Sequence, residues 1–256
     1  MQFLAIIPAR YSSTRFPGKP LAMLGGKPVV QHVYERAQAV FDRVAVATDD
    51  ERIAACVETF GGMAVMTAPT HRSGTDRAFE ASQKLGGDAD VVVNIQGDEP
   101  FVHASQLEAL KSLFNDSRTD IGTLVKPFPA DTSWDTLANP NTPKVVLAAD
   151  GSALYFSRSV IPYLRGSERD EWPARHTYYK HIGLYAYRAD VLRRITVMQP
   201  GVLEQAESLE QLRWLENGLR IRTAQTHIET IGIDTPEDLQ RAEQFINSKG
   251  SNPNNV

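Results

Sequence analysis

The chain has 256 residues, of which 42% are apolar, and a formal net charge of −4 at pH 7. A chain of this length and composition can bury a sizeable core, so it is expected to fold as one α/β domain or as one domain with an insertion. The weak negative charge gives no overall attraction to nucleic acid, so any binding of phosphate must come from a local cluster of cations.

Membrane proteins and cysteine-rich proteins are also excluded as classes. No run of about 18 apolar residues is present, and the first ten residues lack the basic start and the small-residue cleavage site of a signal peptide. Cys56 is the only cysteine, which excludes disulfides within the chain and cysteine-rich zinc sites. We therefore expect a cytoplasmic protein without membrane insertion.

Apolar runs alternate with helical patterns over the first 130 residues. This alternation predicts a Rossmann-like α/β fold with a mostly parallel sheet that is covered by helices on both faces. The predicted strands are 3–9, 43–48, 63–68, 90–95 and 121–125. The predicted helices are 28–40, 49–61, 74–87 and 103–116.

The pattern changes after residue 130, where antiparallel elements are predicted. Residues 144–163 indicate two strands joined at Asp150-Gly151, a pair of residues typical of a two-residue hairpin turn. Further along the chain we expect strands at 181–188 and 221–227 and helices at 208–220 and 235–248, the last capped by Thr235. The expected domains are a core at 1–130, an elaboration at 131–205, a return to the core at 206–248 and a loose tail at 249–256.

The loop after the first predicted strand, ARYSSTRFPGK, concentrates positive charge. Arg10, Arg15 and Lys19 accompany three hydroxyl side chains at 12–14, and we expect no nearby carboxylate to neutralise them. Open parallel sheets bind ligands beyond the carboxyl ends of their strands, so this loop is predicted to bind a polyanion such as a triphosphate. Neither the Walker A pattern nor the G-x-G-x-x-G pattern is present. The alternative is a solvated basic loop.

Acidic residues follow two strand-like runs. Asp98 and Glu99 come after the strand at 90–95, at the same predicted sheet edge as the basic loop, and Asp234 precedes the last helix. Magnesium binds carboxylate oxygens together with water and phosphate, so one or two such acids beside a triphosphate are sufficient. Alternatively, Asp98 and Asp234 belong to helix caps.

Two further segments carry candidate binding residues. In THRSGTDRA, Arg72 and Ser73 lie in a loop ahead of a helix, where they could approach a nucleobase or only form a capped helix entry with a solvated arginine. In HIGLYAYR, His181 and Tyr185 are two steps of alternation apart, so they are expected to share one face of the strand. A histidine on a strand is more often structural than catalytic.

The segments IPARYSSTRFPGKPL, ATDDERI, HRSGTDRAFEA, VVNIQGDEP, YFSRSVIPY, HIGLYAYR, LEQAESLEQLRWLENG and GIDTPEDLQRAE follow one another over most of the chain. In this order they resemble the sugar nucleotidyltransferases of the cytidylyltransferase type, in particular the branch that acts on 3-deoxy-D-manno-octulosonate (KDO). Ala9 and Tyr11 stand where the broader family has glycines, a departure that the KDO branch tolerates.

The resemblance implies a fold of the nucleotide-diphospho-sugar transferase type and an enzyme that transfers CMP from CTP to the anomeric hydroxyl of KDO. The products would be CMP-KDO, for lipopolysaccharide biosynthesis, and pyrophosphate. It implies Mg²⁺ as cofactor and CTP and KDO as substrates. It also implies that 1–130 binds the nucleotide and that 131–205 binds the sugar and forms a homodimer.

The resemblance also assigns residues. The expected catalytic residues are Arg10, Arg15 and Lys19. The expected nucleotide-binding residues are Pro8, Ala9, Arg10, Ser13, Lys19, Arg72 and Ser73. The expected sugar-binding residues are Gln96, Arg158, His181, Tyr185, Glu207 and Glu210, and the expected magnesium ligands are Asp98 and Asp234.

Three alternatives remain open from the sequence. The first is a cytidylyltransferase for another acidic sugar such as sialic acid, and the second is a sugar-1-phosphate nucleotidyltransferase. The third is a regulatory protein that binds a nucleotide without turnover, against which the combination of Arg10, Lys19, Asp98 and Asp234 speaks. No Ser-His-Asp arrangement or cysteine nucleophile is recognisable, so no covalent intermediate is expected.

Overall fold

The computed structural model describes residues 1–229 and 232–249. It contains two compact units: the first comprises Met1–Leu107 and the segment from Glu229 on, and the second comprises Glu108–Ile228. The sequence placed its divisions at 130/131 and 205/206 instead. Of the predicted loose tail, only Lys249 is described, as the last residue of helix α10, and the rest lies outside the described residues.

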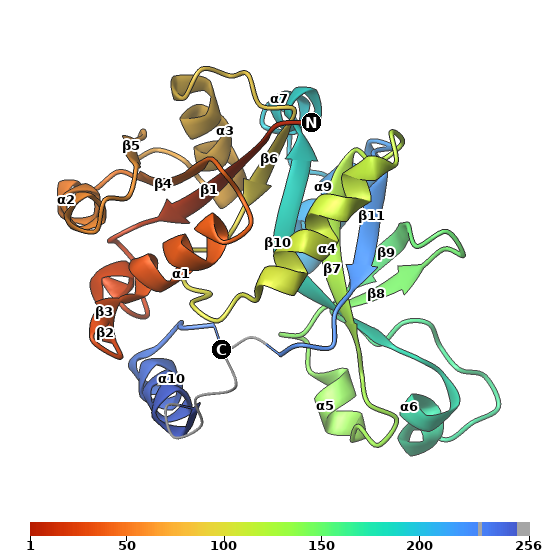
Figure 1. Cartoon of the computed structure of the whole chain (residues 1–256). Helices are drawn as coiled ribbons and strands as arrows, with labels where there is room; N and C mark the ends of the chain where they lie inside the picture. Colours follow the sequence, from red (N-terminus) through yellow and green to blue (C-terminus); the bar gives the residue numbers. More distant parts are fainter. Residues whose placement is uncertain (230–231, 250–256) are drawn as a thin grey trace. The chain divides into compact units, whose positions relative to one another are not determined.

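The first unit is built on a parallel sheet with the strand order β6-β1-β4-β5 (Figure 1). Strands β1, β4 and β6 consist largely of buried apolar residues, the pattern expected of a parallel sheet covered on both faces. The predicted strands are confirmed, with the bounds β1 Phe3–Ala9, β4 Val44–Thr48, β5 Ala64–Met66 and β6 Val91–Asn94.

The predicted helices of this unit are also confirmed. Helix α1 packs on β1 and β4, α2 packs on β4 and β5, and α3 contacts all four strands. Right-handed crossovers place α1 and α3 on opposite faces of the sheet (Figure 1). The bounds are α1 Val29–Gln38, α2 Glu51–Thr59, α3 Gly74–Lys84 and α10 Pro236–Lys249, with α4 Ala104–Ser112 at the boundary of the units. Short elements that were not predicted are η1 Lys19–Leu21, β2 Met23–Leu24 and β3 Lys27–Pro28.

The carboxyl ends of β1 and β6 form the topological switch point of this sheet. From β1 the chain proceeds through β4 to β5 on one side and returns to β6 on the other. Such a point is where open α/β sheets bind their ligands. The segment after β6 approaches β1 closely, because a Cβ atom on Gly97 would lie 2.7 Å from the carbonyl oxygen of Pro8. Glycine is therefore required there by the backbone approach.

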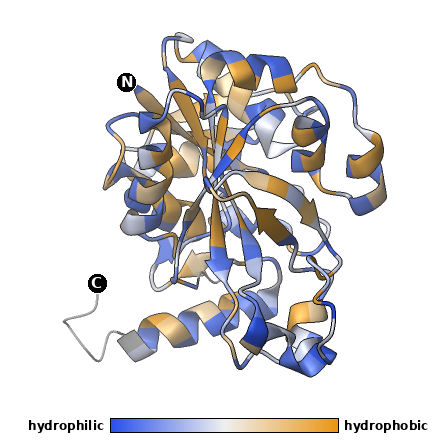
Figure 2. Ribbon diagram, turned by 90° about the vertical axis from the view of Figure 1, so that its right-hand side faces the viewer, coloured by the Kyte–Doolittle hydropathy of each residue, from blue (hydrophilic) through white to orange (hydrophobic). Residues whose placement is uncertain are grey.

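The second unit contains the predicted antiparallel elements. Strand β10 runs antiparallel to β7 and β8, β8 pairs with β9, and β11 is parallel to β7. Figure 2 shows hydrophobic residues gathered along the strands and mixed faces on the helices. The strands are β7 Ile121–Pro127, β8 Lys144–Leu147, β9 Ala153–Ser157, β10 Tyr179–Arg188 and β11 Ile221–Gln225. The helices are η2 Leu113–Asn115, α5 Trp134–Ala138, η3 Arg169–Glu171, α6 Trp172–Arg175, α7 Ala189–Ile195, α8 Val202–Glu207 and α9 Glu210–Glu216.

The predicted hairpin at Asp150-Gly151 is confirmed, but the prediction that a two-residue turn joins its strands is wrong. The strands end at Leu147 and resume at Ala153, and the connection is closed by hydrogen bonds from Ala148 N to Ser152 O (2.8 Å) and from Gly151 N to Ala148 O (2.9 Å). The Asp150 carboxylate accepts from Ser152 N and pairs with Arg222, which stabilises the wider loop.

No helix within the described parts of the chain is long and apolar enough to cross a membrane.

Candidate active site

The basic loop follows β1 directly and is closed on itself. Gly18 N donates to Tyr11 O (2.8 Å), and Phe16 N donates to the hydroxyl of Ser13 (3.3 Å). The side chain of Phe16 packs against a buried cluster that includes Leu24 and Ile233. Lys19 therefore lies at the first position of η1, beyond the carboxyl end of β1.

Lys19 lies between two carboxylates from distant parts of the sequence. Its Nζ is 2.5 Å from Asp98 Oδ2 and 3.0 Å from Asp234 Oδ1, and Arg15 Nη2 is 3.1 Å from Asp234 Oδ2. We call these four residues the Lys19 cluster. The expectation that no nearby carboxylate neutralises the loop is therefore wrong, because Asp98 reaches it from the segment after β6 and Asp234 from the segment before α10.

In the described parts of the chain, the carboxylates of Asp98 and Asp234 contact Lys19 and Arg15 and form no helix cap. The cap of α10 is formed by Thr235 and Asp238: Asp238 N donates to Thr235 Oγ1 (3.2 Å), while the backbone N–H groups of Asp234 and Thr235 donate to Asp238 Oδ2. Before α4, His103 N donates to Gln106 Oε1. Both carboxylates face the basic loop instead. From the sequence, a position in a helix cap was also open for them.

The two carboxylates of the Lys19 cluster favour the protonated form of Lys19. Partial burial alone would lower the pKa of Lys19, but the charges and hydrogen bonds of Asp98 and Asp234 outweigh it and raise that pKa, so the ammonium stays protonated at neutral pH. Among the described residues, no group of three or more metal-binding side chains gathers. Two carboxylates are nevertheless a suitable donor set for Mg²⁺ when phosphate and water supply the remaining ligands.

The segment with Arg72 and Ser73 lies near the same strand ends. Ser73 caps α3, because its hydroxyl accepts from Asp76 N (3.2 Å), and the backbone at Gly74 approaches Pro8 and Asn94. The side chain of Arg72 is exposed. Gln96 is half-buried just after β6, and Ala9 is buried at the end of β1. Ala9 and Ser73, predicted to bind the nucleotide, and Gln96, predicted to bind the sugar, thus lie along one edge of the sheet.

The sequence analysis missed one buried cation at this edge, Arg77 of α3. Its side chain is 0% exposed, its Nη1 donates to Thr67 Oγ1 (2.5 Å) and its Nη2 is 3.3 Å from Asp49 Oδ2. Burial lowers the pKa of Arg77, Asp49 opposes this shift and the charge of Arg10 adds to it. The signal in the sequence was the place of Arg77 beside Ala78 and Ala81 on the apolar face of the predicted helix.

In the second unit, His181 and Tyr185 share one face of β10, opposite Val125 and Thr123. Their ring centroids are 5.3 Å apart, and Thr123 Oγ1 lies 3.1 Å from His181 Nε2. A bulge between Ile182 and Tyr185 interrupts the simple alternation that the sequence suggested. Among the described residues, the buried hydroxyl of Tyr185 has no hydrogen-bond partner, so a polar ligand would satisfy it.

Burial of His181 predicts a pH dependence of stability. Burial lowers its pKa from 6.5 to about 4, so between these values the unfolded chain binds a proton that the folded protein does not. The free energy of unfolding is therefore expected to fall by about 3 kcal/mol as the pH drops from 6.5 to 4. Urea unfolding of the wild type and of His181→Gln at pH 7, 5 and 4 checks this. Parallel pH curves for the two proteins would contradict it.

Arg158 and Glu207, both predicted to bind the sugar, contact each other. Arg158 N donates to Glu207 Oε2 (2.7 Å), its Nε donates to Glu207 O (2.6 Å), and Ser157 Oγ donates to Glu207 Oε1 (2.6 Å). The other guanidinium nitrogens of Arg158 donate to the carbonyls of Pro140 and Ser208. Glu210 lies at the start of α9, 3.5 Å from Arg213. The structure thus ties α8 to the end of β9.

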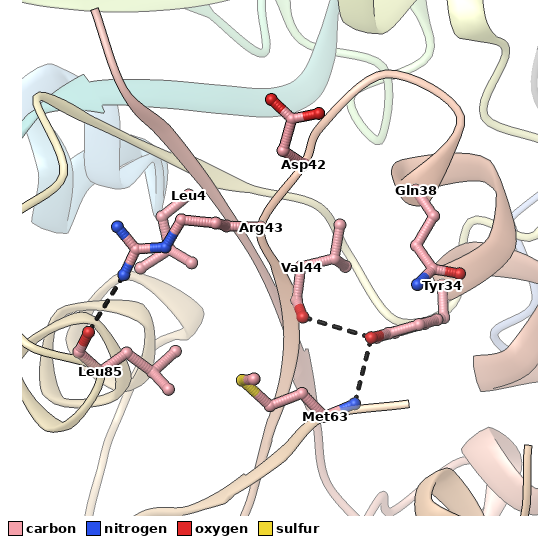
Figure 3. Close-up of a pocket in the computed structure, with 8 residues that line it drawn as sticks. All are labelled: Leu4, Tyr34, Gln38, Asp42, Arg43, Val44, Met63 and Leu85. Carbon is pink, nitrogen blue, oxygen red and sulfur yellow. Dashed lines mark hydrogen bonds between the residues drawn. The ribbon is translucent and has the colours of Figure 1, made fainter. Parts of the chain in front are cut away.

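A separate pocket of about 290 Å³ lies at the opposite, amino-terminal end of the first unit's sheet (Figure 3). Its lining includes Leu4 and Val44 near the starts of β1 and β4. The cation in it, Arg43, already binds Asp88 (2.9 Å) and the carbonyl of Leu85 (3.1 Å). This pocket therefore does not compete with the strand ends for an anionic ligand.

Comparisons with known proteins identify the family of this chain. A cytidylyltransferase family model matches residues 4–221. The 3-deoxy-manno-octulosonate cytidylyltransferase of Bacteroides thetaiotaomicron is 61% identical over 249 residues, which covers 97% of this chain and 100% of the relative. That of Phocaeicola vulgatus is 60% identical over 249 residues, with coverage of 97% and 99%. The solved structure of CMP:2-keto-3-deoxy-manno-octonic acid synthetase complexed with CTP is 42% identical, with a TM-score of 0.89 and coverage of 97% and 100%. The chain belongs to the cytidylyltransferase family and, within it, to the 3-deoxy-manno-octulosonate cytidylyltransferases.

Proposed function

We propose that this protein transfers CMP from CTP to the anomeric hydroxyl of KDO, forming CMP-KDO for lipopolysaccharide biosynthesis and releasing pyrophosphate. The observation that carries the proposal is the Lys19 cluster, which gathers two cations and two carboxylates at the switch point of a parallel sheet. Family membership supports the choice of CTP and KDO.

In this proposal the first unit binds the nucleotide. Arg10, Arg15 and Lys19 balance the negative charge of the phosphates, since charged donors held in place before the reaction need no reorganisation during it. Ser13 stabilises the loop through the N–H of Phe16. The backbone around Pro8 and Ala9, together with Arg72 and Ser73, would contact the nucleoside part of CTP.

Asp98 and Asp234 would hold Mg²⁺. They fit the ion because both already contact one cation, the ammonium of Lys19. When bound, the ion would neutralise phosphate charge and lower the pKa of the attacking hydroxyl. Lys19 would then shift part of its interaction from the carboxylates to the phosphates, which its flexible side chain permits.

The second unit would supply most of the sugar-binding groups. His181 is neutral near pH 7, so it can exchange hydrogen bonds with sugar hydroxyls but does not offer a positive charge to the KDO carboxylate. Tyr185 has a hydroxyl available for a hydrogen bond. The contacts of Arg158 and Glu207 suggest that they shape the site between α8 and β9. We retain Gln96 and Glu210 as further sugar-binding residues.

The chemistry is one in-line displacement. The anomeric oxygen of KDO forms a bond to the α-phosphorus of CTP and loses its proton, while the bond from that phosphorus to the β-phosphate oxygen breaks and its electrons leave with pyrophosphate. Positioning and charge stabilisation are sufficient for such a transfer. No residue of the Lys19 cluster needs to form a covalent intermediate.

Pyrophosphate release tests this function. We expect release with CTP, KDO and Mg²⁺, and much slower release when UTP or ATP replaces CTP, when sialic acid replaces KDO, or when a chelator removes the metal. Faster release with sialic acid would identify a different acidic sugar as the substrate. Tight CTP binding without release under any of these conditions would indicate a regulatory nucleotide-binding protein. The homodimer and the cytoplasmic location stay predictions.

A further inference from the structure

Tyr11, the first residue after Arg10 in the basic loop, is held by an arginine from a different element. The guanidinium carbon of Arg52, in the first turn of α2, lies 3.3 Å from the centroid of the Tyr11 ring. This is a close cation–π stack. We call Tyr11, Gly18, Asp50 and Arg52 the Tyr11 clasp.

Arg52 is itself fixed before it meets the ring. The Asp50 carboxylate accepts from Arg52 N (3.0 Å) and Nε (2.9 Å) through Oδ1 and from Nη2 (2.6 Å) through Oδ2. Asp50 is the N-cap of α2, and its own N–H donates to Thr48 Oγ1 at the end of β4. The planar guanidinium is thus oriented by a strand end and a helix start, which reduces the entropy lost on stacking.

Gly18 completes the clasp from inside the loop. Its N–H donates to the carbonyl of Tyr11 (2.8 Å), and it has a φ of +72°, which favours glycine. A Cβ atom on Gly18 would lie 3.1 Å from the Tyr11 ring, so the ring packs where another residue would place its side chain. These contacts close the loop from Tyr11 to Gly18, with Arg15 within it and Lys19 next to it in sequence.

We propose that Arg52 is a positioning residue of the nucleotide site: by stacking on Tyr11 it holds the 11–18 loop closed and thereby fixes Arg15 and Lys19 for the phosphates of the nucleotide. This inference rests on the proposed function for the identity of the nucleotide, CTP. Within the described residues the side chain of Arg52 contacts Asp50 and Tyr11, so it acts on Arg15 and Lys19 through Tyr11. Its side chain is 59% exposed, so its removal does not disturb the core.

The test combines a structural and a kinetic readout on Arg52→Ala, Tyr11→Leu and the double variant. Without nucleotide, the exchange of the Gly18 amide hydrogen, measured by NMR, is expected to be about 2- to 5-fold faster in Arg52→Ala, the range given by an exposed cation–π contact. KM for CTP is expected to rise by a similar factor while KM for KDO and the melting temperature stay unchanged. In the Tyr11→Leu background, Arg52→Ala is expected to add nothing further.

Arg118→Ala is the matched control. Arg118 forms the same fork with Asp116, through N (2.9 Å), Nε (3.0 Å) and Nη2 (2.8 Å), and its side chain is 64% exposed in the second unit. Its removal is expected to leave KM for CTP and Gly18 exchange unchanged.

The claim that Arg52 closes the loop through Tyr11 would be overturned if the Gly18 amide exchanged at the wild-type rate in Arg52→Ala. It would also be overturned if the effects of Arg52→Ala and Tyr11→Leu were additive in the double variant. Faster exchange with an unchanged KM for CTP would overturn its positioning role. Absence of CTP turnover in the wild type would contradict the proposed function instead, and Gly18 exchange would still report whether the clasp exists.

Discussion

Lys19→Ala is expected to lower kcat for pyrophosphate release by on the order of 10²-fold or more, the scale for the loss of one charged donor that is held in place before the reaction. Lys19 contacts both Asp98 and Asp234, and its side chain is only 14% exposed, so no other cation can easily replace it. Its removal leaves two carboxylates beside the phosphates without the ammonium. Steady-state assays at saturating CTP and KDO measure the effect.

Lys27→Ala is the control for this prediction. Lys27 lies in the same unit and its ammonium is 2.7 Å from Glu35, but both side chains of this pair are exposed, and their contact contributes little. We expect the wild-type kcat for Lys27→Ala. The same outcome for Lys19→Ala would remove Lys19 from the mechanism and leave Arg10 and Arg15 as the cations to examine.

The regular elements of the first unit could be predicted because local patterns determine them. The apolar run 3–9 coincides with β1, since a strand buried on both faces needs no polar alternation. Thr235 was recognised as the cap of α10 from its position before Pro236, a local signal as well. The alternation of strands and helices then predicted a parallel sheet, and the basic loop follows a strand at its carboxyl end, where such sheets bind ligands.

The partners of the charged groups could not be predicted in the same way. Lys19 meets Asp98 and Asp234 across 79 and 215 residues, and no periodicity within the loop contains this information. Helix α8 was also missed, because none of its residues is buried and it therefore leaves no apolar stripe in the sequence. The sequence could indicate a phosphate site, whereas the balance of charge within that site depends on the tertiary fold.

Arg77 illustrates the same limit and leads to a prediction for stability. The helix at 74–87 was predicted, but its arginine was not expected to point inward, where it is 0% exposed. Arg77→Met preserves much of the side-chain volume and leaves the Asp49 carboxylate, which is 14% exposed, without its guanidinium. Removing one partner of a buried ion pair costs about 3–5 kcal/mol, and the partial exposure of Asp49 favours the lower value.

We therefore expect Arg77→Met to lower the free energy of unfolding by about 3 kcal/mol, and the melting temperature by on the order of 10 °C. Urea and thermal unfolding measure both. Arg43→Met, which breaks the exposed pair with Asp88, serves as the control and is expected to cost less than about 1 kcal/mol. The double variant Arg77→Met, Asp49→Asn should recover part of the loss, because the uncompensated charge is removed. If it recovers nothing, the loss comes from packing and from the hydrogen bond to Thr67 Oγ1 rather than from the buried charge pair.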